Sequence, residues 1–167
     1  MAKKILIGLV VIIGILVAVI ATRPSSFHIE RAADMNAPPA VVFAQVNDFH
    51  RWEAWSPWAK LDPSMKAEFS DAAAGEGAIY SWSGNDQVGE GKMTIVESKP
   101  PERVRLKLEF LKPYAAQNIT AFDFKGDNGK SKVTWAMEGN NNFMMKAFSM
   151  FMNMDVMIGK DFEKGFV

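Results

Sequence analysis

The side chains suited to proton transfer are few and lie far apart in the sequence. The candidates are one histidine with its acidic neighbours, one tyrosine and two further carboxylates: His50 with Asp48 and Glu53, then Tyr114, Glu90 and Glu109. General acid and base catalysis needs groups held within hydrogen-bond reach of the reacting atoms and with tuned pKa values. The spacing does not establish such a pair, so we predict surface positions for these side chains and assign no catalytic residue.

Metal and phosphate chemistry also find little support. Cysteine is absent, and His28 and His50 are the only histidines, with no His-x-x-x-His pair or carboxylate-rich loop around them. Two glycine pairs, at positions 75 and 77 and at positions 89 and 91, lie in a strand-rich region, where hairpin bends explain them better than a phosphate cradle does. The sequence therefore predicts no metal site and no cofactor.

The charge balance argues against a nucleic-acid partner. Lys plus Arg equals Asp plus Glu at 19 each, and Lys3 and Lys4 precede an apolar segment, which leaves 17 basic against 19 acidic residues beyond it. A domain so close to neutral presents no electrostatic footprint for nucleic acid. At 167 residues the chain has room for one domain and a short appendage.

A methionine-rich stretch near the C-terminus is the most informative feature for binding. Six of the eleven methionines fall within it: Met144, Met145, Met150, Met152, Met154 and Met157. Unbranched thioethers repack around ligands of varied shape, but they also serve as ordinary core. With Phe148 and Phe151 among them, the stretch is apolar nearly all round, which is more than one core-facing stripe requires. Core packing, cavity lining, and contact with a membrane or another chain are three open interpretations.

Tryptophans form the second group of candidates. Trp52, Trp55 and Trp58 follow one another at intervals of three, and they either gate a cavity, rest at a bilayer interface or plug the core. Trp82 and Trp135 lie on the inward faces of expected strands, where they either line a cavity or fill the core.

Alternation of apolar and polar residues predicts a strand-rich domain that positions these side chains. A first strand is expected at residues 27–31, and a helix at 39–49 follows Pro38. Alternation returns from Met65 onward and predicts a hairpin over 78–83 and 88–96, a strand at 103–110, and a second hairpin over 118–125 and 130–138 with its turn at 126–129. One buried and one solvated face are typical of such strands.

The chain is expected to finish in one long helix from about Phe143 to the end. Apolar residues recur along a single stripe at helical spacing: Ala147, Phe151, Met154, Ile158 and Phe162. A curved antiparallel sheet with this helix against its concave face accounts for the order of strand, helices, many strands and helix. The predicted fold class is therefore α+β.

Residues 1–22 are expected to form a membrane-spanning helix, joined by a linker at 23–26 to a domain at 27–167. Residues 5–21 are an uninterrupted apolar run of 17, and at 1.5 Å per residue they reach roughly 25 Å, near a bilayer core of about 30 Å. The run also fits a secretory signal, because Val19-Ile20-Ala21 resembles a cleavage site. Lys3 and Lys4 favour a cytoplasmic N-terminus, which leaves the domain on the extracytoplasmic, periplasmic side, either anchored by a single pass or released after cleavage.

Several short segments together resemble one known family. They are the Asn-Ala-Pro-Pro run at 36–39, Trp-Glu-Ala-Trp-Ser-Pro-Trp at 52–58, and the segments 75–85, 88–95 and 133–137. On these segments the chain from about Phe27 to its end resembles the polyketide cyclase/dehydrase and lipid-transport (SRPBCC) superfamily. Domains of that superfamily adopt the helix-grip fold, which START domains and Bet v 1 allergens share. An N-terminal membrane segment is not one of its general features.

The resemblance implies a deep, mainly apolar cavity between the sheet and the C-terminal helix, used across the superfamily for lipids, sterols, quinones, hormones or polyketide intermediates. The side chains expected to line it are Trp55, Tyr80, Trp82, Leu106, Leu108, Phe110, Trp135, Met137, Phe151, Met154 and Ile158. The leading expectation is a non-enzymatic, membrane-tethered protein that binds a hydrophobic small molecule such as a lipid or a quinone. Two alternatives stay open: a cyclase or dehydratase acting on a polyketide-like substrate, and an interaction module that uses the methionine-rich helix. The sequence does not specify the oligomeric state.

Overall fold

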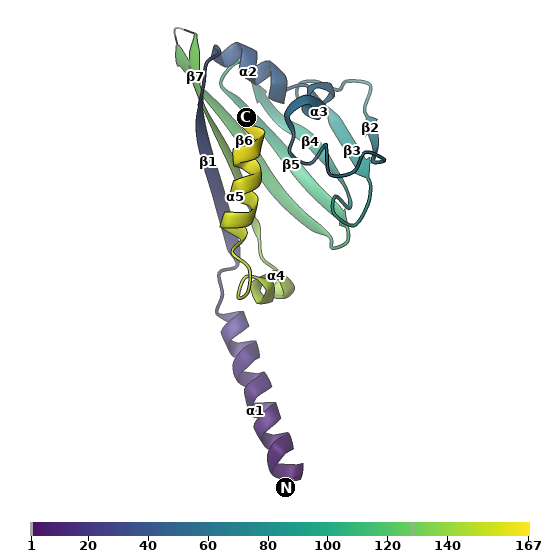
Figure 1. Cartoon of the computed structure of the whole chain (residues 1–167), viewed down its shortest axis with the longest axis vertical. Helices are drawn as coiled ribbons and strands as arrows, with labels where there is room; N and C mark the ends of the chain where they lie inside the picture. The colour runs from purple at the N-terminus through teal and green to yellow at the C-terminus, as the bar shows by residue number, and fades with distance from the viewer. Residues whose placement is uncertain (1, 128) are drawn as a thin grey trace.

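A long apolar helix begins the chain and projects away from everything that follows (Figure 1). In this computed structural model, which describes residues 2–127 and 129–167, the helix α1 (Ala2–Ala21) buries only Ile20. Its 20 residues span about 30 Å at 1.5 Å per residue, which is enough to cross a bilayer core. By length and composition, α1 is compatible both with a membrane anchor and with a signal sequence.

Within the described residues, seven antiparallel strands form one sheet; six of them coincide with predicted strands, whereas the short strand at residues 66–69 is not predicted separately. In chain order they are β1 (Ser26–Met35), β2 (Lys66–Phe69), β3 (Ile79–Ser83), β4 (Glu90–Lys99), β5 (Arg103–Lys112), β6 (Ala116–Asp127) and β7 (Lys130–Asn140). Across the sheet the order is β1-β7-β6-β5-β4-β3-β2, so the first strand pairs with the last. The turn expected between β6 and β7 includes Asn128, which lies outside the described residues.

Strand β5 illustrates why the sheet has two unlike faces. Val104, Leu106 and Leu108 are buried on its concave side. On the opposite side Arg103 pairs with Asp123 of β6, with 2.6 Å between Nε and Oδ1. Because successive side chains of a strand point to opposite faces, the strict alternation of this segment buries one face and hydrates the other.

Short helices cover the concave face at the end of the sheet farthest from α1 (Figure 1). Helix α2 (Pro39–Val46) contacts β5, β6 and β7, and a proline in its first turn suits the fixed φ of that position. The rings of Phe43 and Phe124 meet edge to face there, with centroids 5.7 Å apart. A 3-10 turn (Phe49–Arg51) and α3 (Trp52–Trp55) follow, so the helix expected over 39–49 ends early.

The prediction of one continuous helix from Phe143 to the end of the chain is wrong, because this segment forms two helices. They are α4 (Phe143–Phe148) and α5 (Met154–Gly165), separated by residues 149–153. Each begins at an asparagine cap: the side chains of Asn142 and Asn153 accept hydrogen bonds from backbone N–H groups three residues later, at 2.9 and 3.2 Å. A capping asparagine starts a new helix rather than continuing the previous one, so the chain turns between them.

Of the two C-terminal helices, α5 is the one that packs against the concave face of the sheet. Its Phe162 is fully buried and lies parallel to the indole of Trp135 on β7, with ring centroids 4.1 Å apart. Arg31 of β1 holds the helix from the side, at 3.0 Å from a carboxylate oxygen of Asp155 and 3.0 Å from one of Glu163. Gly159 allows this approach, because a side chain there would meet the guanidinium group.

Candidate functional site

A row of aromatic side chains crosses the concave face from β3 to β5. Trp82 of β3 pairs in register with Gly91 of β4, which in turn pairs with Phe110 of β5. The indole of Trp82 lies over Gly91 and meets the ring of Phe110 edge to face at 6.0 Å. Tyr80 stacks on Trp82 at 5.9 Å. All three rings are only partly buried, so this aromatic row (Tyr80, Trp82 and Phe110) gives the concave face an apolar surface that a ligand can reach.

Gly91 is essential to the row, and its position corrects the interpretation of this glycine as a hairpin bend. Gly89, with φ of +63°, lies at the bend between β3 and β4, whereas Gly91 lies inside β4. A Cβ on Gly91 would lie 2.5 Å from the ring of Trp82 and 2.6 Å from the carbonyl oxygen of Glu109. A glycine inside a strand often marks a close approach, and this was the available signal in the sequence.

Tyr80 brings a titratable group into the aromatic row. Burial raises the pKa of its hydroxyl, and the negative charge of Glu53 raises that pKa further. A phenol with a raised pKa stays protonated at neutral pH. Tyr80 can therefore donate a hydrogen bond to a ligand, but it is a poor general base.

Packed side chains fill the part of the concave face beneath α5 and α3. The rings of Trp135, Phe122 and Trp55 contact one another, with centroids 4.6 to 6.1 Å apart. The indole N–H of Trp135 donates to the hydroxyl of Thr120 at 3.0 Å, and that hydroxyl donates to a backbone carbonyl. Within residues 2–127 and 129–167, every buried side-chain nitrogen and oxygen has a hydrogen-bond partner. This region is therefore a closed core, and its buried polar side-chain atoms already have hydrogen-bond partners within the protein.

Ten of the eleven side chains predicted to line a cavity belong to the hydrophobic core or pack against it. Four are buried: Leu106, Leu108, Trp135 and Met137. Six are partly buried around them: Trp55, Tyr80, Trp82, Phe110, Met154 and Ile158. Phe151 is not with them; it is 85% exposed, because it lies in the break between α4 and α5 rather than on a continuous helical stripe.

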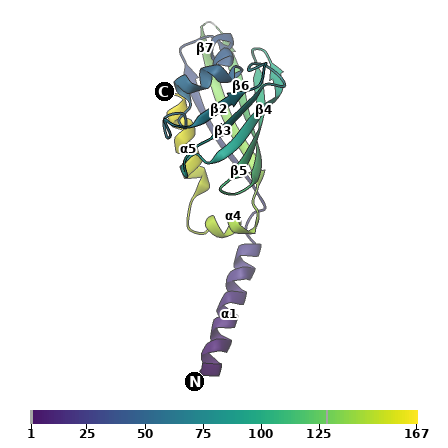
Figure 2. The ribbon, with the colours of Figure 1, turned by 90° about the vertical axis from the view of Figure 1, so that its right-hand side faces the viewer.

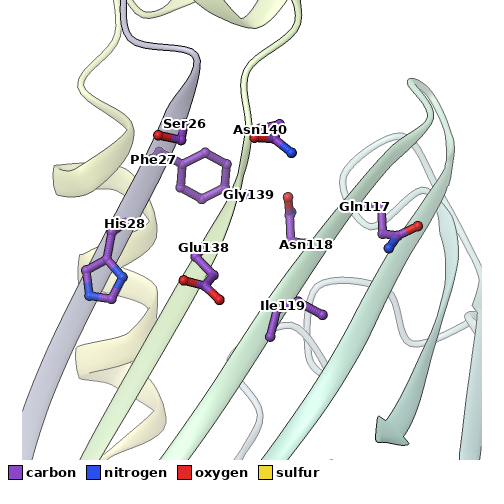
Figure 3. A pocket seen from close by; sticks show the side chains of 9 residues that line it. All are labelled: Ser26, Phe27, His28, Gln117, Asn118, Ile119, Glu138, Gly139 and Asn140. Atoms are coloured by element: carbon purple, nitrogen blue, oxygen red, sulfur yellow. The ribbon is translucent and has the colours of Figure 1, made fainter.

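Two open hollows lie at the ends of the strands and not between the sheet and α5. The first, of about 450 Å³, lies where β1, β6 and β7 meet next to α1, and three residues of each strand line it (Figure 3): Ser26, Phe27, His28, Gln117, Asn118, Ile119, Glu138, Gly139 and Asn140. The second, of about 440 Å³, lies at the other end of the same strands beside Lys125, Lys130 and Lys132. Neither is the deep apolar cavity that the resemblance implies, and the stack of Trp135 on Phe162 occupies the space beneath α5.

The proton-transfer candidates do not come together on the aromatic row. The Asp48 carboxylate accepts a hydrogen bond from the backbone N–H of His50, and the imidazole lies exposed against Phe69. Alternation places Glu90 and Glu109 on the opposite face of the sheet, where hydrogen bonds from lysine ammonium groups lower the pKa of each carboxyl. Such carboxylates stay ionised and do not serve as general acids at neutral pH. Over the described ranges, no three His, Asp or Glu side chains gather into a group that could hold a metal ion.

Comparison with known proteins places this geometry among related folds. Residues 26–165 match the sequence model of a family described as polyketide cyclase / dehydrase and lipid transport. No curated protein matches the chain.

Several solved structures share the fold. A protein from Chromobacterium violaceum is similar over 85% of this chain and 92% of its own, with 15% identity and a TM-score of 0.56. A protein from Thermobifida fusca covers 80% of this chain and 83% of its own, with 17% identity and a TM-score of 0.58. The ginseng major latex-like protein from Panax ginseng covers 86% and 99%, with 11% identity and a TM-score of 0.56. These similarities confirm the Bet v 1-like α+β arrangement of an antiparallel sheet with a C-terminal helix.

Proposed function

Since the chain belongs to the polyketide cyclase/dehydrase and lipid transport family, we propose that it is a membrane-tethered binding protein for a hydrophobic small molecule such as a lipid or a quinone. Proteins of this family typically bind hydrophobic ligands. The observation that carries the proposal is the aromatic row, whose three rings lie side by side on the concave face and stay partly exposed.

The ligand's apolar part is proposed to lie on the aromatic row. Buried Leu108 and Met93 lie directly next to it across β5 and β4, which makes the surface around the rings continuously apolar. Met154 and Ile158 of α5 are partly buried at the margin of the same core, and their side chains are proposed to close over the ligand. Methionine suits this role because its unbranched thioether adapts to ligands of different shape.

A polar end of the ligand is proposed to meet the Tyr80 hydroxyl, which is protonated at neutral pH and can donate a hydrogen bond. One hydrogen bond on an otherwise apolar surface orients a molecule such as a quinone without supplying chemistry. The proposed activity is therefore binding and carriage rather than conversion.

The α1 helix supports the tethering part of the proposal. A poorly soluble ligand is concentrated in the bilayer, so a domain held at its surface meets that ligand far more often than a free one does. With Lys3 and Lys4 before the helix, the domain is proposed to lie on the extracytoplasmic side.

Native mass spectrometry of the full-length chain, extracted in mild detergent, tests the binding proposal. We expect one co-purified hydrophobic molecule per chain, identified after release by its mass and fragmentation. Trp82→Ala should weaken binding of that molecule by about tenfold, equivalent to about 1.4 kcal/mol, because it removes the central ring of the row.

The matched control is Val96→Ala on β4, since Val96 is 41% exposed and lies outside the row. Equal occupancy in the parent chain, Trp82→Ala and Val96→Ala would reject the aromatic row as the binding surface. A chain that carries no hydrophobic molecule in any preparation would contradict the carrier function itself.

A further inference from the structure

Residues 143–152, which comprise α4 and the segment that follows it, form an apolar surface that the core does not use. No residue of α4 is buried. Five large apolar side chains of this membrane-proximal segment are exposed: Phe143, Met144, Phe148, Phe151 and Met152. Phe151 alone is 85% exposed, which is costly for a phenylalanine in water. An apolar cluster of this kind marks an interaction surface.

Polar contacts hold the membrane-proximal segment against the end of α1. The ammonium group of Lys146 lies 2.9 Å from the hydroxyl of Ser25 and 3.5 Å from the carbonyl oxygen of Ala21, the last residue of α1. The side-chain amide of Asn141 donates to the carbonyl of Pro24 at 3.2 Å. The exposed apolar side chains are thus fixed beside the point where the apolar helix ends.

The direction of α4 relative to α1 determines how the membrane-proximal segment would meet a bilayer. α4 contacts α1, and Figure 2 shows it lying crosswise to the α1 axis, between that helix and the sheet. If α1 crosses a bilayer, its C-terminal end lies at one surface, and a crosswise helix at that end runs along the surface. This is the orientation of an interfacial helix.

We propose that the membrane-proximal segment inserts its apolar side chains into the lipid interface next to α1, which gives the domain a second contact with the bilayer. This inference rests on the proposed tether. The charge pattern fits it, because residues 140–157 contain only Lys146 and Asp155 as charged side chains, and Asp155 is held by Arg31. No free carboxylate of this stretch has to approach anionic headgroups, and Lys146 matches them.

A second contact between the domain and the bilayer would also fix how the aromatic row is oriented relative to the membrane. Phe110 pairs with Ala116 at the end of β5, Asn118 pairs with Gly139 at the end of β7, and the chain then enters α4. The strand ends that carry Phe110 therefore lie at the same end of the sheet as the membrane-proximal segment. A hydrophobic molecule that leaves the bilayer at α4 would therefore meet the sheet at the end where Phe110 lies.

The chain contains no cysteine, which permits a direct test with single introduced thiols. Phe151→Cys and, as control, Val41→Cys are labelled with an environment-sensitive nitrobenzoxadiazole probe in the full chain, reconstituted into phosphatidylcholine nanodiscs. Both native side chains are exposed, and Val41 lies on α2 at the end of the sheet farthest from α1 (Figure 1). We expect a blue-shifted emission at position 151, and loss of most of that emission when the lipids carry an acyl-chain quencher. The probe at position 41 should emit as it does in water, both with and without the acyl-chain quencher.

The possible failures are distinguishable. If alkaline carbonate leaves the chain in the membrane but the probe at position 151 behaves as in water, the interfacial contact is refuted and the tether stands. If carbonate extracts the whole chain, the tether fails and this inference fails with it. If the probe is shielded in native membranes but not in pure-lipid nanodiscs, the surface binds a protein and the proposed lipid contact is wrong.

Discussion

Replacing Phe162 by alanine tests whether one stacked ring fixes α5 on the sheet. Removal of a fully buried phenylalanine side chain costs about 3–5 kcal/mol, of which the aromatic stack accounts for about 0.5–1.5 kcal/mol. Phe162 has no exposed surface, and its partner Trp135 is held in place by the hydrogen bond to Thr120. The core therefore has little freedom to collapse into the space. We expect a loss near the middle of that range.

For a chain of this size, 1 kcal/mol corresponds to about 2–4 °C in melting temperature, so a loss of about 4 kcal/mol should make Phe162→Ala melt roughly 8–16 °C below the parent. The measurement is thermal unfolding of the full chain in detergent, followed by near-ultraviolet circular dichroism of the tryptophans. Val156→Ala on the same helix is the control, because Val156 is 44% exposed and its truncation should cost no more than about 0.5 kcal/mol. If both variants melt at the same temperature, α5 does not depend on this stack.

Two further predictions concern the start of α5, and a third concerns the orientation that α1 gives the domain. Hydrogen bonding by Arg31 lowers the pKa of Asp155, so this ion pair stabilises the fold above the ordinary carboxyl pKa of 3.8 and is lost as the pH falls through the lowered value. The melting temperature of Asp155→Asn should therefore lie below that of the parent at pH 7 and converge with it in acid; a constant difference would contradict this linkage. Asn153→Ala should cost about 1 kcal/mol through loss of the helix cap, whereas Asn153→Asp should retain the parent melting temperature. Protease added to intact spheroplasts should degrade the domain, and complete protection would reverse the proposed orientation.

Six of the seven strands could be predicted from the sequence because each of the six carries its own signal. In β5 the alternation of Val104, Leu106 and Leu108 with charged residues leaves one arrangement in which the apolar set is buried. The register between strands is a different matter. The aromatic row exists because Trp82 lies opposite Gly91 and Gly91 lies opposite Phe110, across a register shift at the start of β4. No local pattern in either strand specifies that shift.

The helical end of the chain shows where periodicity misleads. Phe151 falls on the same 3.6-residue stripe as Met154 and Phe162, and the stripe predicts burial for all three. The caps at Asn142 and Asn153 divide the segment into two helices, and Phe151 lies between them. Asparagine at a helix start is a recognisable signal, but the strong apolar period outweighed it in the prediction.

The break between α4 and α5 follows from the path of the chain. β7 ends beside α1, and α5 runs from that end of the sheet back toward α2 (Figure 1). A continuous helix on the axis of α5 would need its first eleven residues, 143–153, to extend about 16 Å beyond the sheet, along the direction of α1 and away from any core. The break instead turns these residues crosswise at the end of α1, where Phe143, Met144, Phe148, Phe151 and Met152 stay exposed. With the proposed tether, this turn would lie at a bilayer surface, where apolar side chains are stabilised by the lipid interface, and the proposal would account for a methionine-rich stretch that exceeds what the core requires.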